Sequence, residues 1–253
     1  MQLDEILTWL RSIAPEETAF TGDPVGLLVR TTECDITNVS VTLDATPATV
    51  SATVDSGSQL LVCHHPLIYA PLKRVLASDP IGSAVSTLVT SGVALYAMHT
   101  NWDRAVGGVN DTLAGLLSLT DIVPLEETGD AQIARVGNLP EPMTAKVFAS
   151  FIGRALDVTN ESALRYNSRL DDTMISRVAV CGGAGASLVS SAIAAGADAF
   201  VTSDVRHHEF VDANVRRFPL FDAGHGATER PGMAALAQRI RAQFPQLNVS
   251  YHE

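Results

Sequence analysis

Short apolar runs alternate with longer amphipathic stretches along the whole chain. Runs such as QLLVCH (59–64), VALYAMH (93–99) and DAFVTS (198–203) are nearly continuous in apolar residues, which is typical of strands buried on both faces. The pattern predicts strands at about 37–43, 59–63, 93–98, 132–137, 162–166, 176–181, 198–202, 218–222 and 247–251. It predicts helices at about 3–13, 46–56, 79–91, 109–117, 143–156, 185–195, 207–215 and 229–243.

This order of elements predicts an α/β fold. Because helices separate the buried strands, we expect a layered α/β/α arrangement with two interlinked halves and a largely parallel sheet. The stretch 125–175 is more polar than the rest and is broken by Pro140 and Pro142. We interpret it as a connecting region, which divides the chain into an N-terminal α/β half, 1–125, and a second part, 126–253, with the connecting region and a C-terminal α/β half.

Composition narrows the class of protein. Of the 253 residues, 46% are hydrophobic and only 18% are charged, which excludes a disordered or coiled-coil chain. The net charge of −11 makes nucleic acid an unexpected partner without a local basic patch, and it suits metal cations. The N-terminus lacks a basic region and is typical of an amphipathic helix, and no apolar run is long enough to span a membrane. Three scattered cysteines indicate reduced thiols and a cytoplasmic location. Two of them, Cys63 and Cys181, end apolar runs and are predicted to be buried.

Polar residues cluster where the apolar runs end, which is the edge of a parallel sheet where sites form. The run LLVCHHP ends at His64 and His65, and neighbouring imidazoles at a strand end can serve different metal ions. Ordinary hydrogen-bonded loop histidines explain this pair equally well. The next such run ends at His99, and Asp103, a carboxylate that can bridge two cations, follows four residues later. Asp103 also fits a turn residue, and His99 fits a residue that orients a ligand.

Two more strand ends carry the same kinds of residue. After 198–202 come Asp204 and the pair His207 and His208. Asp204 alone fits a helix cap, and the group fits substrate contact or the support of neighbouring metal ligands. After 218–222 come His225 and Glu229, which are four residues apart at the start of a helix and so face one side. A helix-dipole role explains Glu229 but leaves His225 without one. Six of the seven histidines lie in these four segments, so together they favour a metal site.

The stretch CGGAGASL (181–188) is glycine-rich and precedes a predicted helix. Such a place suits an anion, because backbone N–H groups point outward there. The stretch lacks the lysine of a phosphate-binding loop and the third glycine of a dinucleotide fingerprint. We therefore favour a tight strand-to-helix turn.

The segments that carry these residues resemble one family, the Ngg-interacting-factor-three-like proteins, which are dinuclear-metal-centre hexamers often labelled GTP cyclohydrolase type 2 homologues. The resemblance lies in DPVGLLV (23–29), TLDAT (42–46), LLVCHHPLIYAPLKRV (60–75), HTNWDRAVGGVND (99–111), VAVCGGAGASL (178–188), GADAFVTSDVRHHE (196–209) and DAGHGATERPG (222–232). Two positions depart from the family pattern. Ser203 stands where the family often has glycine, and Gly226 stands where it often has an aromatic residue.

The resemblance implies a ligand set and an assembly. It implies that two divalent ions (Zn, Fe, Mn or Ni) lie between the halves on His64, His65, Asp103, His225 and Glu229, with Asp103 or Glu229 bridging. It also implies a ring-shaped homohexamer.

Function follows as an expectation with alternatives. We expect a dinuclear-metal-dependent hydrolase of a nucleotide or related phosphoester, of the GTP cyclohydrolase kind or a phosphodiesterase, with His99 as a catalytic residue and Asp204 and His208 in substrate binding. The run His-His-Pro is similar to that of Asp-His-His phosphoesterases, with Cys63 in place of their Asp. The alternative from another class is a non-enzymatic metal-binding or regulatory scaffold protein.

Overall fold

The computed structural model describes residues 1–30, 35–158 and 164–252. The chain forms two compact units. Unit 1 consists of 1–108 and 233–253, and unit 2 of 109–232. The return of 233–253 to unit 1 was not foreseen from the sequence. The division at residues 125 and 126 stays a prediction about domains.

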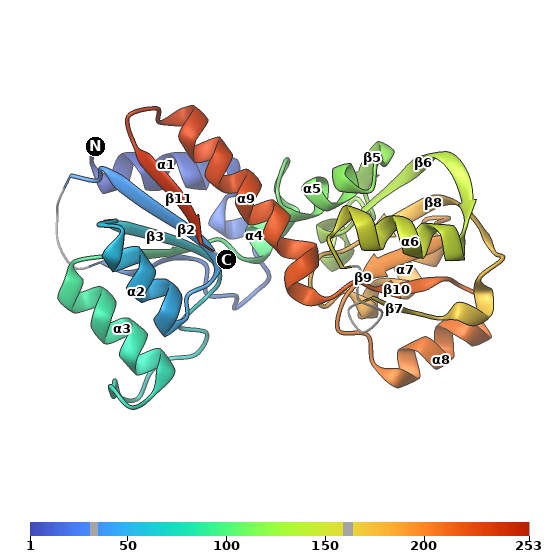
Figure 1. Cartoon of the computed structure of the whole chain (residues 1–253), viewed down its shortest axis with the longest axis horizontal. Coiled ribbons are helices and arrows are strands. Elements are labelled where there is room, and N and C mark those ends of the chain that lie inside the picture. The colour runs from blue at the N-terminus through green and yellow to red at the C-terminus, as the bar shows by residue number, and fades with distance from the viewer. Residues whose placement is uncertain (31–34, 159–163, 253) are drawn as a thin grey trace. The chain divides into compact units, whose positions relative to one another are not determined.

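Unit 1 is built on a five-stranded sheet in the order β1-β4-β3-β2-β11. Its central strands β2 (Asn38–Asp44), β3 (Leu60–His65) and β4 (Ala94–Ala97) are parallel, as is β11 (Asn248–His252) beside β2, while β1 (Gly26–Val29) is antiparallel to β4. Helices α2 (Pro47–Asp55) and α3 (Pro80–Ser91) lie on one side of this sheet. On the other side lie α1 (Leu3–Ile13) and the later part of α9 (His225–Gln243) (Figure 1). The short helices η1 (Glu16–Thr18) and α4 (Thr100–Arg104) complete the unit.

Unit 2 is built on a six-stranded sheet in the order β5-β6-β8-β9-β10-β7. The central strands β8 (Met174–Val180), β9 (Ala199–Thr202) and β10 (Leu220–Asp222) are parallel, and β5 (Thr120–Pro124), β6 (Arg135–Thr144) and β7 (Arg165–Tyr166) pair antiparallel at the two edges. The helices are α5 (Val109–Leu116), α6 (Ala145–Ala155), α7 (Val189–Ala194) and α8 (His207–Val215), with the short turns η2 (Asp130–Ile133), η3 (Ser168–Leu170) and η4 (Ala186–Leu188).

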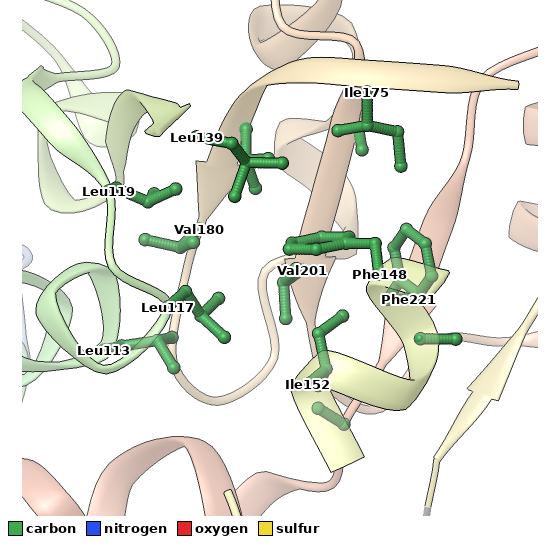
Figure 2. Close-up of a cluster of buried hydrophobic side chains, with 14 of the residues drawn as sticks. Leu113, Leu117, Leu119, Leu139, Phe148, Ile152, Ile175, Val180, Val201 and Phe221 are labelled. Carbon is green, nitrogen blue, oxygen red and sulfur yellow. The ribbon is translucent and has the colours of Figure 1, made fainter. Parts of the chain in front are cut away.

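The core of unit 2 lies between its sheet and the helices α5 and α6. Figure 2 shows Leu113 of α5, Leu117 directly after this helix, and Phe148 and Ile152 of α6. They lie over the strand residues Val180, Val201 and Phe221. The rings of Phe148 and Phe221 meet edge to face, with centroids 5.3 Å apart. Burial of this apolar surface fixes the three parallel strands and thereby the loops that follow them.

Local sequence signals explain why the helices begin where they do. Helix α2 starts with a capping box between Thr46 and Thr49 and has Pro47 in its first turn. Helix α3 follows the same rule, with Asp79 accepting a bond from the Ile81 N–H. It ends at Gly92, whose left-handed conformation (φ 70°) closes the helix.

The expected α/β fold is confirmed, with parallel pairs in both sheets. Two predicted bounds were wrong where the site lies. Strand β3 continues to His65, so both histidines of the pair belong to the strand. Helix α9 begins at His225 and not at 229, because Gly224 takes a positive φ of 83° that turns the chain directly into the helix. The elements β1, β5 and α4 were not predicted.

Candidate metal centre

The first group of candidate ligands lies at one edge of the sheet of unit 1. Strands β2, β3 and β4 are parallel neighbours, so their carboxyl ends meet there. Asp44 ends β2 opposite His65, which ends β3. His99 follows β4, and Asp103 lies one turn further on, in α4. The sheet topology thus gathers residues from three separate segments. We call His64, His65, His99 and Asp103 the first cluster.

His64 is fully buried and its ring is fixed by the backbone. Its Nδ1 lies 2.7 Å from the carbonyl oxygen of Met98. Because a carbonyl only accepts, Nδ1 carries the proton and the lone pair is on Nε2 when the ring is neutral. That Nε2 lies 3.4 Å from Oδ1 of Asp103, whose carboxylate is also buried. A histidine that binds a metal ion through Nε2 needs this tautomer.

His65 and His99 are oriented by carboxylates in the same way. Nδ1 of His65 lies 2.7 Å from Asp44, and Nδ1 of His99 lies 2.7 Å from Asp23. Burial opposes the ionisation of Asp23, but hydrogen bonds from His99 and Thr100 outweigh it and lower the pKa of that carboxyl.

The three imidazoles of the first cluster converge. Potential ligand atoms of His64, His65 and His99 all lie within 4.8 Å of one another. The structure therefore brings together His64, His65 and Asp103 as expected, and it places His99 among them.

The second cluster lies in unit 2 and consists of His225 and Glu229. They occupy the first turn of α9, and the Nε2 atom of His225 lies 3.2 Å from Oε2 of Glu229. The other ring nitrogen, Nδ1, lies 2.6 Å from Asp204 in the loop after β9. Glu229 is almost fully buried, whereas His225 is half-buried. As in unit 1, a carboxylate holds the Nδ1 side of the imidazole.

The glycine-rich turn after β8 makes room for this second cluster. Gly183 has a left-handed φ of 64°, and a Cβ at this position would collide with the carboxylate of Glu229. Its N–H donates to the hydroxyl of Thr228, which in turn donates to the carbonyl of His225. The turn and the start of α9 are thus one hydrogen-bonded unit.

The same turn is not an open anion cradle. The N–H groups of Gly182, Gly183 and Gly185 donate to side chains of Asn110, Thr228 and Thr202, at 2.7, 3.0 and 2.9 Å. Because these donors are already used, the stretch 181–188 is the tight strand-to-helix turn that we favoured from the sequence.

Asp222 ties together the two loops that carry the second cluster. This buried carboxylate accepts bonds from the N–H groups of Val205 and Gly224, the neighbours of Asp204 and His225, at 3.0 and 3.1 Å. It also accepts a short bond from the guanidinium of Arg165. Sequence reasoning missed Arg165 as a supporting residue, and it missed Asp23 and Asp44, although both aspartates lie in segments that resemble the family.

The remaining predicted residues take different places. Asp204 contacts His225, which indicates an orienting role for it. His207 and His208 are exposed at the start of α8. Cys63 and Cys181 are free and buried, as predicted, and Cys34 lies outside the described residues. Burial raises the pKa of the Cys63 thiol to about 12.

Comparison with known proteins shows which family this chain belongs to. The family model described as Duf34/NIF3 (NGG1p interacting factor 3) matches residues 1–253. The chain belongs to the Duf34/NIF3 family. A Streptomyces coelicolor relative named GTP cyclohydrolase 1 type 2 homolog is 37% identical over 91% of this chain and 82% of its own length. One of the same name from Streptococcus pneumoniae is 32% identical over 89% and 85%. The crystal structure of a Bacillus cereus protein related to NIF3 has the same fold, with a TM-score of 0.92, 22% identity and coverage of 100% and 97%.

The two departures from the Duf34/NIF3 pattern lie beside the second cluster. The guanidinium of Arg230 lies against Gly226, where a Cβ would come within 2.9 Å of it. Ser203 is fully buried directly before Asp204, and its hydroxyl has no hydrogen-bond partner among the described residues. The first departure thus leaves a cation next to a position without a side chain, and the second buries an extra polar group.

We expect Ser203→Ala to raise the free energy of unfolding by about 1 kcal/mol, because it removes a buried hydroxyl that forms no hydrogen bond with the described part of the chain. Denaturant unfolding followed by circular dichroism measures the change. Thr202→Val is the matched control. The hydroxyl of Thr202 bonds to Gly183 and Gly185, so its loss should destabilise the protein. A loss of stability in Ser203→Ala would contradict the prediction.

The metal-free protein should show an unusually basic His225. The hydrogen bond to Glu229 raises the pKa of His225 from 6.5 to about 9 against partial desolvation, and Asp204 acts in the same direction. A raised pKa in the folded state stabilises the protein fully below pH 6.5, and this contribution is lost as the pH rises through about 9. NMR titration of the ring protons should give a lower pKa in Glu229→Gln. An unchanged pKa in that variant would exclude Glu229 as the cause.

Proposed function

We propose that this chain is a divalent-metal-dependent hydrolase acting on a nucleotide or a related phosphoester. His64, His65, Asp103, His225 and Glu229 would hold two ions, with Asp103 or Glu229 as the bridging ligand. The observation that carries the proposal is the anchoring of the histidines. All four imidazoles of the two clusters have Nδ1 within 2.6–2.7 Å of a carboxylate or carbonyl oxygen.

Such anchoring fits metal binding better than it fits ordinary packing. Histidines that ligate metals almost always donate their other N–H to a carboxylate or carbonyl, which fixes the tautomer and ring orientation. In addition, Asp103 and Glu229 are buried carboxylates that lie against imidazole nitrogens. A divalent cation offsets the cost of burying such charges. Nitrogen and oxygen ligands of this kind suit Zn, Fe, Mn or Ni.

The residues around the ligands have distinct tasks in this proposal. Bound ions would supply a nucleophilic hydroxide near neutral pH and would stabilise developing negative charge. Asp44 and Asp204 hold the rings of His65 and His225 in place. His99, oriented by Asp23, is the residue that we propose moves a proton.

The names of relatives support a nucleotide as the substrate class. Relatives covered over most of their length carry the name GTP cyclohydrolase 1 type 2 homolog. Ring opening of a purine and cleavage of a phosphoester are both hydrolytic, so both belong in the first assays.

We propose that the exposed His208 contacts the substrate. His208→Ala should then raise KM while the metal content stays constant.

The experiment that tests the proposal measures metal content and turnover together. Reconstituted protein should contain about two ions per chain by elemental analysis. It should also hydrolyse at least one member of a panel with GTP and bis(p-nitrophenyl) phosphate. One ion or none would overturn the ligand set. Two ions with no turnover would overturn the hydrolase and leave a metal-binding or regulatory protein.

His99→Ala should lower turnover by roughly 100-fold while both ions remain bound, as expected for a proton-transfer residue. His207→Ala, at an exposed histidine, is the control and should leave both quantities unchanged. Loss of one ion in His99→Ala would instead make His99 a ligand, which its position beside His64 and His65 allows.

We also propose that the chain assembles as a homohexamer, on the strength of the family resemblance. Light scattering of the purified protein at micromolar concentration tests this. A stable monomer would contradict it.

None of the helices in the described ranges is both long and apolar enough to cross a bilayer.

A further inference from the structure

An open cavity lies in unit 2, beside helix α6 and strand β7, one of the two edge strands of the sheet. Its volume is about 800 Å³, which is within the range of pockets that hold small organic molecules. Apolar groups of Ala149, Gly153 and Leu164 line part of it, together with the ring of Tyr166. That ring is held in place by stacking on Phe221 at 5.3 Å between centroids.

The charged side chains that line this cavity have one sign among the described residues. Lys146, Arg154 and Arg165 line it, and no aspartate or glutamate does so among the described residues. This is unusual in a chain with 28 acidic and 17 basic residues. Asp171 lies nearby, but it accepts the hydroxyl of Tyr166 at 2.8 Å. Neither Lys146 nor Arg154 forms an ion pair with a described residue.

Arg165 connects this cavity with the second cluster. Its guanidinium donates to the carbonyl of Val205 and to Asp222. Asp222 in turn accepts the N–H groups of Val205 and Gly224, next to Asp204 and His225. An anion that competes with Asp222 for Arg165 would therefore act on the carboxylate that ties these two loops together.

We propose that this cavity is a binding site for a small organic anion with an apolar body, such as an aryl phosphate or carboxylate. Lys146 and Arg154 would bind the anionic group, and Ala149, Leu164 and Tyr166 would contact the apolar part. Through Arg165 and Asp222 the bound molecule would alter the loops of the second cluster. This inference does not depend on the proposed hydrolase activity.

Calorimetry with phenyl phosphate and the full chain tests the proposal. We expect saturable binding that the double change Lys146→Ala and Arg154→Ala weakens at least about tenfold, because two charged hydrogen-bond donors are lost. The double change Lys73→Ala and Arg74→Ala removes the same two residue types from exposed positions in unit 1 and should leave binding unchanged. Ser150→Trp fills the cavity without a change in charge and should also weaken binding.

Two further ligands test the contributions of the anionic group and of the ring separately. Phenol lacks the anion and inorganic phosphate lacks the ring, so each should bind more weakly than phenyl phosphate. Equal binding of phenyl phosphate to the Lys146/Arg154 variant and the wild-type chain would overturn the site. The amide NMR signals of Val205 and Gly224 should shift on binding. Unmoved signals at saturation would overturn the link to the second cluster.

Discussion

Glu229→Gln is expected to lower the affinity for divalent metal by about 100-fold or more, a larger loss than is typical for residues that merely support a ligand. The side chain keeps its size, but a neutral amide does not attract or bridge cations as a carboxylate does. Glu229 is buried against His225 and beside Gly183, whereas the other carboxylate that contacts His225, that of Asp204, holds the Nδ1 side of the ring. Titration of the chain with Zn²⁺ against a chelating indicator measures the loss.

Glu141→Gln makes the same chemical change at an exposed position of unit 2 and is the control. It should bind metal as the wild-type chain does. His64→Ala extends the test to unit 1, and it should also lower metal affinity if ligands of both units share the ions. Full affinity in Glu229→Gln together with loss in His64→Ala would confine the metal to the first cluster.

Phe148→Ala should destabilise the protein by about 3–5 kcal/mol, the usual cost of removing a large aromatic side chain from a core. Phe148 is fully buried, packs between α6 and the sheet and meets the ring of Phe221 edge to face (Figure 2). Phe221 directly precedes Asp222, so the space left by the missing Phe148 ring should also loosen strand β10, which leads into the second cluster. Urea unfolding measures the change in free energy.

Val147→Ala is the neighbouring control, because Val147 is 52% exposed. It should change the unfolding free energy by less than about 0.5 kcal/mol. A loss below about 1 kcal/mol in Phe148→Ala would show that the core can collapse around the missing ring, contrary to this prediction.

The sequence alone predicted most of the elements and the segments that form the candidate site. The bounds of α1 and α8 agree with those predicted, because amphipathic spacing and turn residues act over a few positions. Histidines at the ends of apolar runs indicated a site for a general reason. The carboxyl ends of parallel strands meet at one edge, so residues far apart in sequence gather there without any knowledge of the register.

Tertiary structure alone decided which residues support that site. Asp23 reaches His99 across 76 positions, and Arg165 reaches Asp222 across 57. Strand β11 pairs with β2, which returns the end of the chain to unit 1. Such partners depend on strand register and on the direction of each side chain, whereas local pattern reports only burial and period. The sequence thus determined where the candidate ligands lie along the chain, and only the folded chain determined which oxygen atom holds each imidazole.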